Sequence, residues 1–283
     1  MSRIAYVNGR YVPHREASVH VEDRGYQFSD GVYEVIAVEG GRLVDEAGHL
    51  DRLERSLGEL RIARPMGRPA LGLVMREVLR RNRVEDGIIY IQMTRGVAPR
   101  DHAFPKGAPK TAVVMTARRK KAQAAALAER GAKVITIPDI RWERCDIKAV
   151  ALLPNVLGKQ KAVEAGAFEA WQVGEDGFIT EGTSTNAWIV TDKGELVTRQ
   201  TGPEILTGVT RLAVMALAEE RQLKIVERAF TVAEAKAARE AFLTSTTSAV
   251  LPVVAIDGTA VGDGKPGPLT RALREYYLAH AGA

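Results

Sequence analysis

The sequence is poor in cysteine: Cys145 is the only one among 283 residues. A single thiol excludes internal disulfide bonds and metal sites built entirely from thiolates. Long apolar runs are missing too, because a membrane-spanning helix needs about 20 consecutive apolar residues and the longest runs here, such as residues 149–153, are far shorter. Met1-Ser2-Arg3 is not followed by the apolar segment of a secretory signal peptide. We therefore expect a cytoplasmic protein.

Motifs of several common enzyme classes are also missing. The five histidines are never two or four residues apart, so the sequence contains no histidine metal motif, and we expect no metal. It contains neither a P-loop nor the nucleophile elbow of serine hydrolases. These absences weaken the case for a nucleotide-dependent enzyme or a serine hydrolase.

The composition is that of an ordinary globular protein, with 46% hydrophobic and 27% charged residues. The net charge of +5 and the pI near 9.3 reflect a small excess of basic residues, and residues 118–121 form the one dense basic run. Such a run could bind nucleic acid, but no aromatic residues lie within it to stack on bases. We interpret it as exposed surface and expect no nucleic-acid or membrane partner.

The apolar pattern predicts both strands and helices. Asn8-Gly9 between two β-rich runs is a strong hairpin signal, because both turn positions favour positive φ. Four leucines between residues 50 and 60 repeat at helical spacing, which predicts an amphipathic helix over residues 47–62. Strands and helices do not alternate strictly along the chain, which favours an α+β fold over a doubly wound sheet.

The length suits two domains, each with its own core. Residues 118–131 are rich in Ala, Lys and Arg and have no strong apolar stripe. We predict an N-terminal α/β domain over residues 1–117, an interdomain connection over 118–131 and a C-terminal domain over 132–283.

Three features are suited to binding a phosphate group. Gly208 lies among hydroxyl residues where a helix begins, and free amides at a helix N-terminus bind anions. Residues 244–248 are five consecutive hydroxyl residues after a strand, and Arg52 or Arg55 could bind a phosphate with a forked donor. Each feature alone is equally typical of a polar turn or cap. Together they suggest a phosphorylated ligand that need not be a nucleotide.

Three further places could carry chemistry. Lys159 follows an apolar run, and a desolvated lysine amine can act as a nucleophile or base. Lys161 is the alternative, and either could be an ordinary surface lysine. Glu181 lies in a tight polar turn, where a carboxylate could bind a ligand. The same turn could be purely structural, because Gly, Ser and Asn favour turns. Arg100 and His102 lie on a cationic loop that could bind a substrate carboxylate, or they could belong to a weak surface ion pair.

These residues and their order resemble the fold type IV family of pyridoxal-phosphate enzymes, which includes branched-chain and D-amino acid aminotransferases. The lysine comes first, then the glutamate, the Leu-Thr-Gly-Val-Thr turn at 206–210 and the hydroxyl run. Residues 23–34 and 49–56 resemble the N-terminal signatures of the family, and the match runs nearly end to end. Ser29, Ala37, Thr183 and Thr185 depart from residues common in relatives, which affects substrate range more than reaction type.

The resemblance implies a smaller N-terminal α/β sandwich, a larger C-terminal domain with a barrel-like sheet that binds the cofactor, and a homodimer. It implies that Lys159 bonds to pyridoxal 5'-phosphate and moves the proton at the substrate Cα. It also implies that Glu181 faces the pyridine nitrogen and keeps it protonated. The remaining implied contacts are Arg52, Gly208, Val209, Thr210 and Thr246 at the phosphate, Leu206 at the ring face, and Tyr33 and Thr247 near the substrate.

Within this family, Arg100 and His102 decide the expected substrate. An Arg-x-His pair on this loop resembles the carboxylate trap of D-amino acid aminotransferases, in which the loop comes from the neighbouring subunit. We therefore expect ping-pong transamination of D-amino acids, of the type D-alanine plus 2-oxoglutarate giving pyruvate and D-glutamate. The alternatives are a branched-chain L-amino acid aminotransferase, an aminodeoxychorismate lyase, an (R)-selective amine transaminase and a non-catalytic basic binding protein.

Overall fold

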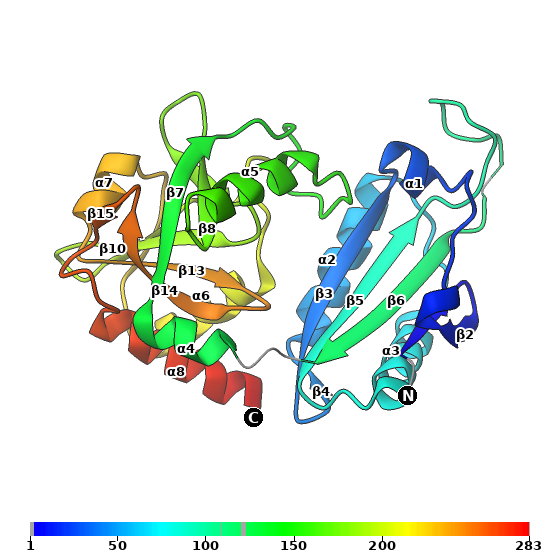
Figure 1. The fold of residues 1–283 in the computed structure, drawn as a ribbon, viewed down its shortest axis with the longest axis horizontal. Coiled ribbons are helices and arrows are strands. Elements are labelled where there is room, and N and C mark those ends of the chain that lie inside the picture. The colour runs from blue at the N-terminus through cyan, green and yellow to red at the C-terminus, as the bar shows by residue number, and fades with distance from the viewer. Residues whose placement is uncertain (1–2, 108, 120–122, 283) are drawn as a thin grey trace. The chain divides into compact units, whose positions relative to one another are not determined.

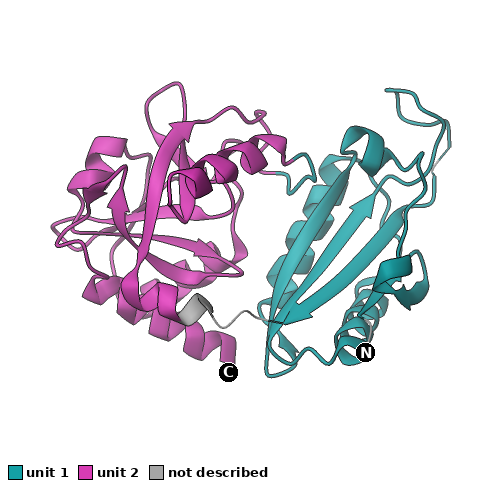
Figure 2. Cartoon of the chain, in the orientation of Figure 1, with its two compact units in different colours: residues 1–121, 147–151 teal, residues 122–146, 152–283 magenta. Residues whose placement is uncertain are grey.

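Residues 3–107, 109–119 and 123–282 are described by the computed structural model of the chain, shown in Figure 1. They form two units, which Figure 2 colours separately. One unit takes in residues 1–121 and 147–151, and the other takes in residues 122–146 and 152–283. No helix in the described residues is long and apolar enough to cross a membrane.

The first unit contains a six-stranded antiparallel sheet in the order β2-β1-β6-β5-β3-β4. Its strands are β1 (Ile4–Val7), β2 (Arg10–Pro13), β3 (Gly31–Glu39), β4 (Arg42–Leu43), β5 (Gly87–Thr94) and β6 (Ala112–Arg119). Its helices are the 3-10 helix η1 (His14–Glu16), α1 (Arg24–Phe28), α2 (Glu46–Glu59) and α3 (Arg68–Asn82).

Local sequence explains much of this unit. The predicted hairpin joins β1 and β2, with φ of 47° at Asn8 and 96° at Gly9. Alternate residues of β3 and β5 are buried, as period-2 patterning requires. Buried leucines and methionines of α2 and α3, such as Leu53 and Met75, pack in one apolar core with sheet residues such as Ile91.

The second unit contains a nine-stranded mixed sheet in the order β12-β11-β10-β13-β14-β7-β8-β9, with β15 paired to β14. Its strands are β7 (Ala132–Pro138), β8 (Glu169–Val173), β9 (Ile179–Gly182), β10 (Asn186–Val190), β11 (Leu196–Thr198), β12 (Ile225–Glu227), β13 (Glu240–Ser245), β14 (Ala249–Ile256) and β15 (Thr259–Ala260). Its helices are α4 (Gln123–Arg130), α5 (Leu153–Glu164), α6 (Val209–Glu220), α7 (Val232–Ala237) and α8 (Pro268–Gly282).

Apolar clusters cover both faces of this second sheet. Trp171 and Phe230 belong to one cluster, whereas Trp188 stacks on Phe242 in the other, with ring centroids 5.3 Å apart. Helices α6 and α8 contribute Val214 and Leu273 to the second cluster, and Figure 1 shows α8 beneath the sheet. Burial on both faces explains why β10 and β13 are almost continuously apolar and show no alternation.

The predicted α+β class and the two-part organisation agree with the fold. The division between the units differs from the predicted one in two respects. Residues 123–130 form helix α4, which belongs to the second unit, where Ala128 joins an apolar cluster. Residues 147–151 return to the first unit, because Val150 N donates to Gly31 O at 3.0 Å beside β3. Lys120 and Lys121 of the basic run lie outside the described residues.

The core of the first unit yields a stability prediction. Leu53 is 2% exposed and Leu73 is 71% exposed. Leu53→Ala should lower the free energy of unfolding by about 2–5 kcal/mol, because it removes buried methyl groups and leaves a cavity. Leu73→Ala, the control, should change it by at most about 0.5 kcal/mol. Urea unfolding should be followed by circular dichroism, because all three tryptophans lie in the second unit and their fluorescence would not report on the first. Equal unfolding midpoints for the two variants would contradict the prediction.

Candidate active site

Glu34 on β3 is a fully buried carboxylate that positions two side chains of helix α2, those of His49 and Arg52. Its Oε1 accepts from Arg52 Nε at 2.7 Å, and its Oε2 accepts from Arg52 Nη2 at 2.9 Å and from His49 Nδ1 at 2.8 Å. Burial raises the pKa of Glu34, but the charge and hydrogen bonds of Arg52, the bond from His49 and the charge of Lys148 together lower it to about 2. An ionised carboxylate only accepts hydrogen bonds, so Nδ1 of His49 carries the proton.

This arrangement distinguishes the two candidate arginines of helix α2. Arg52 has a side chain that is 10% exposed and is held in one orientation by Glu34. Arg55 is 48% exposed and forms an ion pair with Glu59 at 3.9 Å, within its own helix. Arg52 is therefore the better ordered of the two for binding an anion.

Lys148 lies beside the same strand. Tyr33 N donates to Lys148 O at 3.0 Å, and Lys148 N donates to Ser56 Oγ at 3.2 Å, so backbone contacts hold this residue on both sides. Its Nζ lies 4.3 Å from the centroid of the Tyr33 ring. Among the described residues, no carboxylate lies within ion-pair distance of this amine. The fold thus brings Tyr33 next to a lysine that the sequence analysis did not select.

The loop carrying Arg100 and His102 is anchored on helix α1. Arg24, which is 3% exposed, donates to Asp101 O at 2.6 Å and to His102 O at 3.3 Å. Both side chains of interest contact the Phe28 ring: the Arg100 guanidinium is 4.6 Å from its centroid and the His102 ring is 5.4 Å from it. The two predicted carboxylate-binding residues are therefore neighbours.

Ser29 ends helix α1 with a φ of 57°, in the region that favours glycine. This backbone conformation explains why glycine is common at this position in relatives, where the present chain has Ser29.

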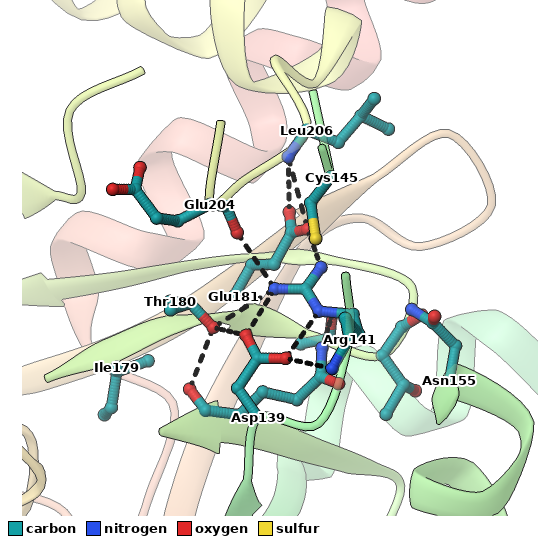
Figure 3. A network of polar contacts seen from close by, with 12 residues as sticks. Asp139, Arg141, Cys145, Asn155, Ile179, Thr180, Glu181, Glu204 and Leu206 are labelled. Atoms are coloured by element: carbon teal, nitrogen blue, oxygen red, sulfur yellow. Dashed lines mark hydrogen bonds and ion pairs between the residues drawn. The ribbon is translucent and has the colours of Figure 1, made fainter. Parts of the chain in front are cut away.

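In the second unit, Glu181 at the end of β9 is nearly buried and both of its carboxylate oxygens are bound. Oε1 accepts from Arg141 Nη1, Oε2 accepts from Asn186 Nδ2 at 3.0 Å, and Leu206 N donates to both oxygens at 3.2 and 3.1 Å. Figure 3 shows the Arg141 guanidinium between the carboxylates of Glu181 and Asp139. The position of Glu181 is therefore set by three donors from different segments.

Charges shape this network. Burial raises the pKa of Asp139, but the hydrogen bonds and charge of Arg141 outweigh it and lower the pKa below its ordinary value. Burial lowers the pKa of Arg141, but Asp139 and Glu181 more than compensate, so it is raised. Burial raises the pKa of Cys145 to about 12, so this residue is a neutral thiol, and its Sγ donates to Trp142 O at 3.1 Å.

The predicted phosphate-binding turn lies where helix α6 begins. Gly208 is the N-cap residue and no side chain caps the helix. The first bond of the helix runs from Leu212 N to Gly208 O at 3.0 Å, so the amides of residues 209–211 precede the ladder and can face an anion. A Cβ on Gly208 would lie 2.1 Å from Asn186 Oδ1, so any larger residue would displace the asparagine that binds Glu181.

The remaining predicted residues lie around this turn and the next one. Val209 and Thr210 are buried in the first turn of α6, and Leu206 is half-buried two residues before Gly208. Thr246 is half-buried and Thr247 is exposed in the turn between β13 and β14, where Ser245 Oγ accepts from Ser248 N at 3.1 Å.

Lys159, by contrast, is engaged elsewhere. Its Nζ donates to Phe168 O and lies 3.7 Å from Oε1 of Glu169. Glu169 is fully buried and also accepts from Thr183 and Ser184. Freeing the amine would leave a buried carboxylate without its cation, which costs several kcal/mol. The geometry therefore gives Lys159 a structural partner, whereas Lys148 has no such carboxylate in the described part of the chain.

The sequence analysis selected neither Lys148 nor Arg141. Lys148 directly precedes the apolar run of residues 149–153, and the desolvation argument made for the lysine after that run applies equally to it. Arg141 carried no such signal, because its two carboxylate partners, Asp139 and Glu181, are two and 40 residues away in the chain.

These residues fit pyridoxal phosphate. In the second unit, the amides at the start of α6 suit a phosphate and a fixed carboxylate at Glu181 suits a ring nitrogen. In the first unit, Arg52 is an ordered cation of the kind that binds a phosphate. The crowding at Gly208 is consistent with such a fit, since only glycine leaves both the turn and Asn186 in place.

Comparison with known proteins agrees with this chemistry. The family model of the class IV aminotransferases matches residues 31–256. The D-alanine aminotransferase of Bacillus licheniformis is 43% identical over 264 residues, covering 93% of this chain and 92% of that protein. The D-alanine aminotransferase of Staphylococcus haemolyticus is 42% identical over 273 residues, covering 96% and 95%.

Solved structures show the same fold. The branched-chain amino acid aminotransferase of Escherichia coli matches with a TM-score of 0.90 at 25% identity, covering 99% of this chain and 94% of that one. The branched-chain enzyme of Thermobaculum terrenum, in its PLP-bound holo form, matches with a TM-score of 0.84 at 25% identity, covering 100% and 95%. From this agreement of sequence, fold and site, the chain belongs to the class IV aminotransferases and is a pyridoxal-phosphate-dependent enzyme of fold type IV.

Proposed function

We propose that this aminotransferase acts on D-amino acids, converting D-alanine and 2-oxoglutarate to pyruvate and D-glutamate in a ping-pong cycle. The observation that carries the proposal is the loop on which Arg100 and His102 share the Phe28 ring. The similarity to proteins named D-alanine aminotransferase, at 41–43% identity, supports it further, because similar branched-chain structures match at 24–27%.

The cofactor supplies an electron sink for the charge that develops at the substrate Cα. In the proposed division of roles, the α6 amides, Arg52 and the hydroxyl of Thr246 bind its phosphate. Glu181 accepts from the ring nitrogen, and Leu206 packs on the ring. Arg100 and His102 hold the substrate carboxylate: Arg100 offers a fork of two N–H donors, and His102 offers one ring N–H. Tyr33 and Thr247 lie near the substrate.

Lys148, in place of Lys159, is the lysine that we propose bonds to the cofactor and carries the proton at Cα. Three observations support this assignment. Lys148 Nζ lies against the Tyr33 ring, its backbone is held by Tyr33 and Ser56, and its charge acts on the carboxylate that holds Arg52. Lys159 is instead the cation of buried Glu169.

A homodimer belongs to the same proposal. Large apolar side chains remain exposed around the loop of Arg100: Val21, Tyr26, Val97 and Phe104 are 71%, 76%, 44% and 47% exposed. Hydrogen bonds tie these segments together, since Ala98 N donates to Glu22 O at 3.3 Å and Gln27 Nε2 donates to Val21 O at 3.1 Å. Such a patch is typical of a subunit interface. A cytoplasmic location, expected from the low cysteine content, completes the proposal.

The assignment of the lysine can be tested directly. Lys148→Ala should abolish turnover, because it removes the amine that bonds to the cofactor and moves the proton. Lys159→Ala should retain turnover and lose stability, since Glu169 loses its cation. Borohydride reduction followed by peptide mapping should find the cofactor on Lys148. Cofactor found on Lys159, or full activity of the Lys148 variant, would return the role to Lys159.

Arg100 should determine substrate affinity. Arg100→Ala should raise the KM for D-alanine about tenfold to a hundredfold, because it removes one charge-assisted hydrogen bond to the substrate. It should leave the absorbance of the bound cofactor unchanged. Arg15→Ala, at an arginine whose side chain is 81% exposed, is the control. An unchanged KM would remove the loop from the substrate site.

Chirality is tested by the absorption band of the bound cofactor. D-alanine should bleach it and 2-oxoglutarate should then restore it, whereas L-leucine should have no effect. Bleaching by L-leucine alone would establish the branched-chain alternative, which the structural neighbours favour. Indifference to both would favour the lyase or the amine transaminase.

A further inference from the structure

We propose that Arg141, anchored by Asp139, is a positioning residue that holds the carboxylate of Glu181 ionised and in one place as the acceptor for the cofactor's ring nitrogen. The inference rests on the proposed role of Glu181. It concerns a residue that does not itself touch the ring nitrogen in this scheme and acts only through the carboxylate.

The geometry of the guanidinium makes Arg141 suited to this role. Nε and Nη2 donate to the two oxygens of Asp139 at 2.9 and 2.7 Å, which fixes the plane of the fork. Nη2 also donates to Glu204 O at 3.0 Å, and Nη1 donates to Glu181. A side chain 6% exposed and bound on both edges of its plane has one orientation (Figure 3). The carboxylate it binds therefore has one orientation too.

Asp139 is anchored in turn. Its Oδ1 accepts from Arg141 N at 3.1 Å, which closes a turn over residues 139–141, and its Oδ2 accepts from Thr180 Oγ1 at 2.7 Å. Thr180 directly precedes Glu181 on β9. Asp139 is thus bound to β9, the strand that carries Glu181.

The charges of Asp139, Arg141 and Glu181 suit a cationic ring nitrogen. Two carboxylates and one guanidinium carry a net charge of −1, and the nearby Cys145 is a neutral thiol. A protonated ring nitrogen at Glu181 brings the sum to zero. Without Arg141 the same carboxylates would carry −2 in a nearly buried site, and one of them would take up a proton from water. A protonated Glu181 no longer stabilises a charged ring nitrogen.

Two cofactor probes separate this role from a merely structural one. Pyridoxal phosphate and its 1-deaza analogue carry the same aldehyde and phosphate, but the analogue has a carbon in place of the ring nitrogen. The ratio of their dissociation constants from the apoprotein therefore measures the contact with the ring nitrogen alone. For the native chain we expect pyridoxal phosphate to bind about tenfold to a hundredfold more tightly, the value of one charged hydrogen bond.

In Arg141→Met we expect this preference to fall to about twofold or less, while binding of the deaza analogue stays near its native value. Arg141→Lys retains a charge but not the fork, so it should give an intermediate ratio; this variant decides the question if the methionine variant does not fold. Arg228→Met is the matched control, because Arg228 forms a surface ion pair with Glu234 in the same unit, and it should keep the native ratio.

Glu181→Gln separates failure of this inference from failure of the proposed function. If Glu181→Gln loses the preference but both Arg141 variants keep it, or weaken the two probes equally, Arg141 is structural only and the inference is overturned. If Glu181→Gln itself keeps the native ratio, the proposed contact of Glu181 with the ring nitrogen is wrong, and the inference is overturned with it.

Discussion

The ion pair between Arg141 and Glu181 organises the buried polar network of the second unit. A buried carboxylate is stable as an anion only if donors and a cation surround it, and here they come from the segment after β7, from β10 and from the loop before α6. Asn186 links this carboxylate to the turn at Gly208, where a side chain would displace it. Glu181 and the amides at the start of α6 are thus parts of one packed arrangement, and neither can shift alone.

The same physical solution recurs in the first unit and explains why the side chain of Arg52 is well ordered. Glu34 is fully buried in β3, and Arg52 and His49 on α2 neutralise it. The pKa of Glu34 is about 2 in the folded chain and 4.5 for the free group, so the ion pair persists at all but strongly acidic pH. Its contribution to stability is fully present above about pH 4.5 and is lost progressively as the pH falls from there toward 2. Arg52 is consequently preorganised, whereas Arg55 remains in solvent.

A buried carboxylate also distinguishes the surroundings of the two candidate lysines. Glu169 is buried as well, and Lys159 serves as its cation. Lys148 contacts an aromatic ring, and in the described part of the chain it meets no carboxylate at ion-pair distance. A carboxylate beside a lysine favours its protonated form, whereas a nucleophilic lysine needs a neutral amine. The surroundings of Lys148 are therefore more compatible with the proposed role than those of Lys159.

The sequence by itself determined the elements whose signals are local. The Asn8-Gly9 hairpin, the amphipathic helix α2 and the glycine that starts α6 follow from turn propensity, periodicity and capping. It also determined the family, because a resemblance spread over the whole chain accumulates many weak matches. Within the site, Glu181 and the turn at Gly208 could be selected because glycine, hydroxyl and acidic residues cluster around them in the sequence. Only the tertiary structure decided which lysine is free, which arginine is ordered and what holds Glu181. Those outcomes depend on ion pairs between residues distant in sequence, such as Arg52 with Glu34 and Arg141 with Glu181, and no local pattern encodes them.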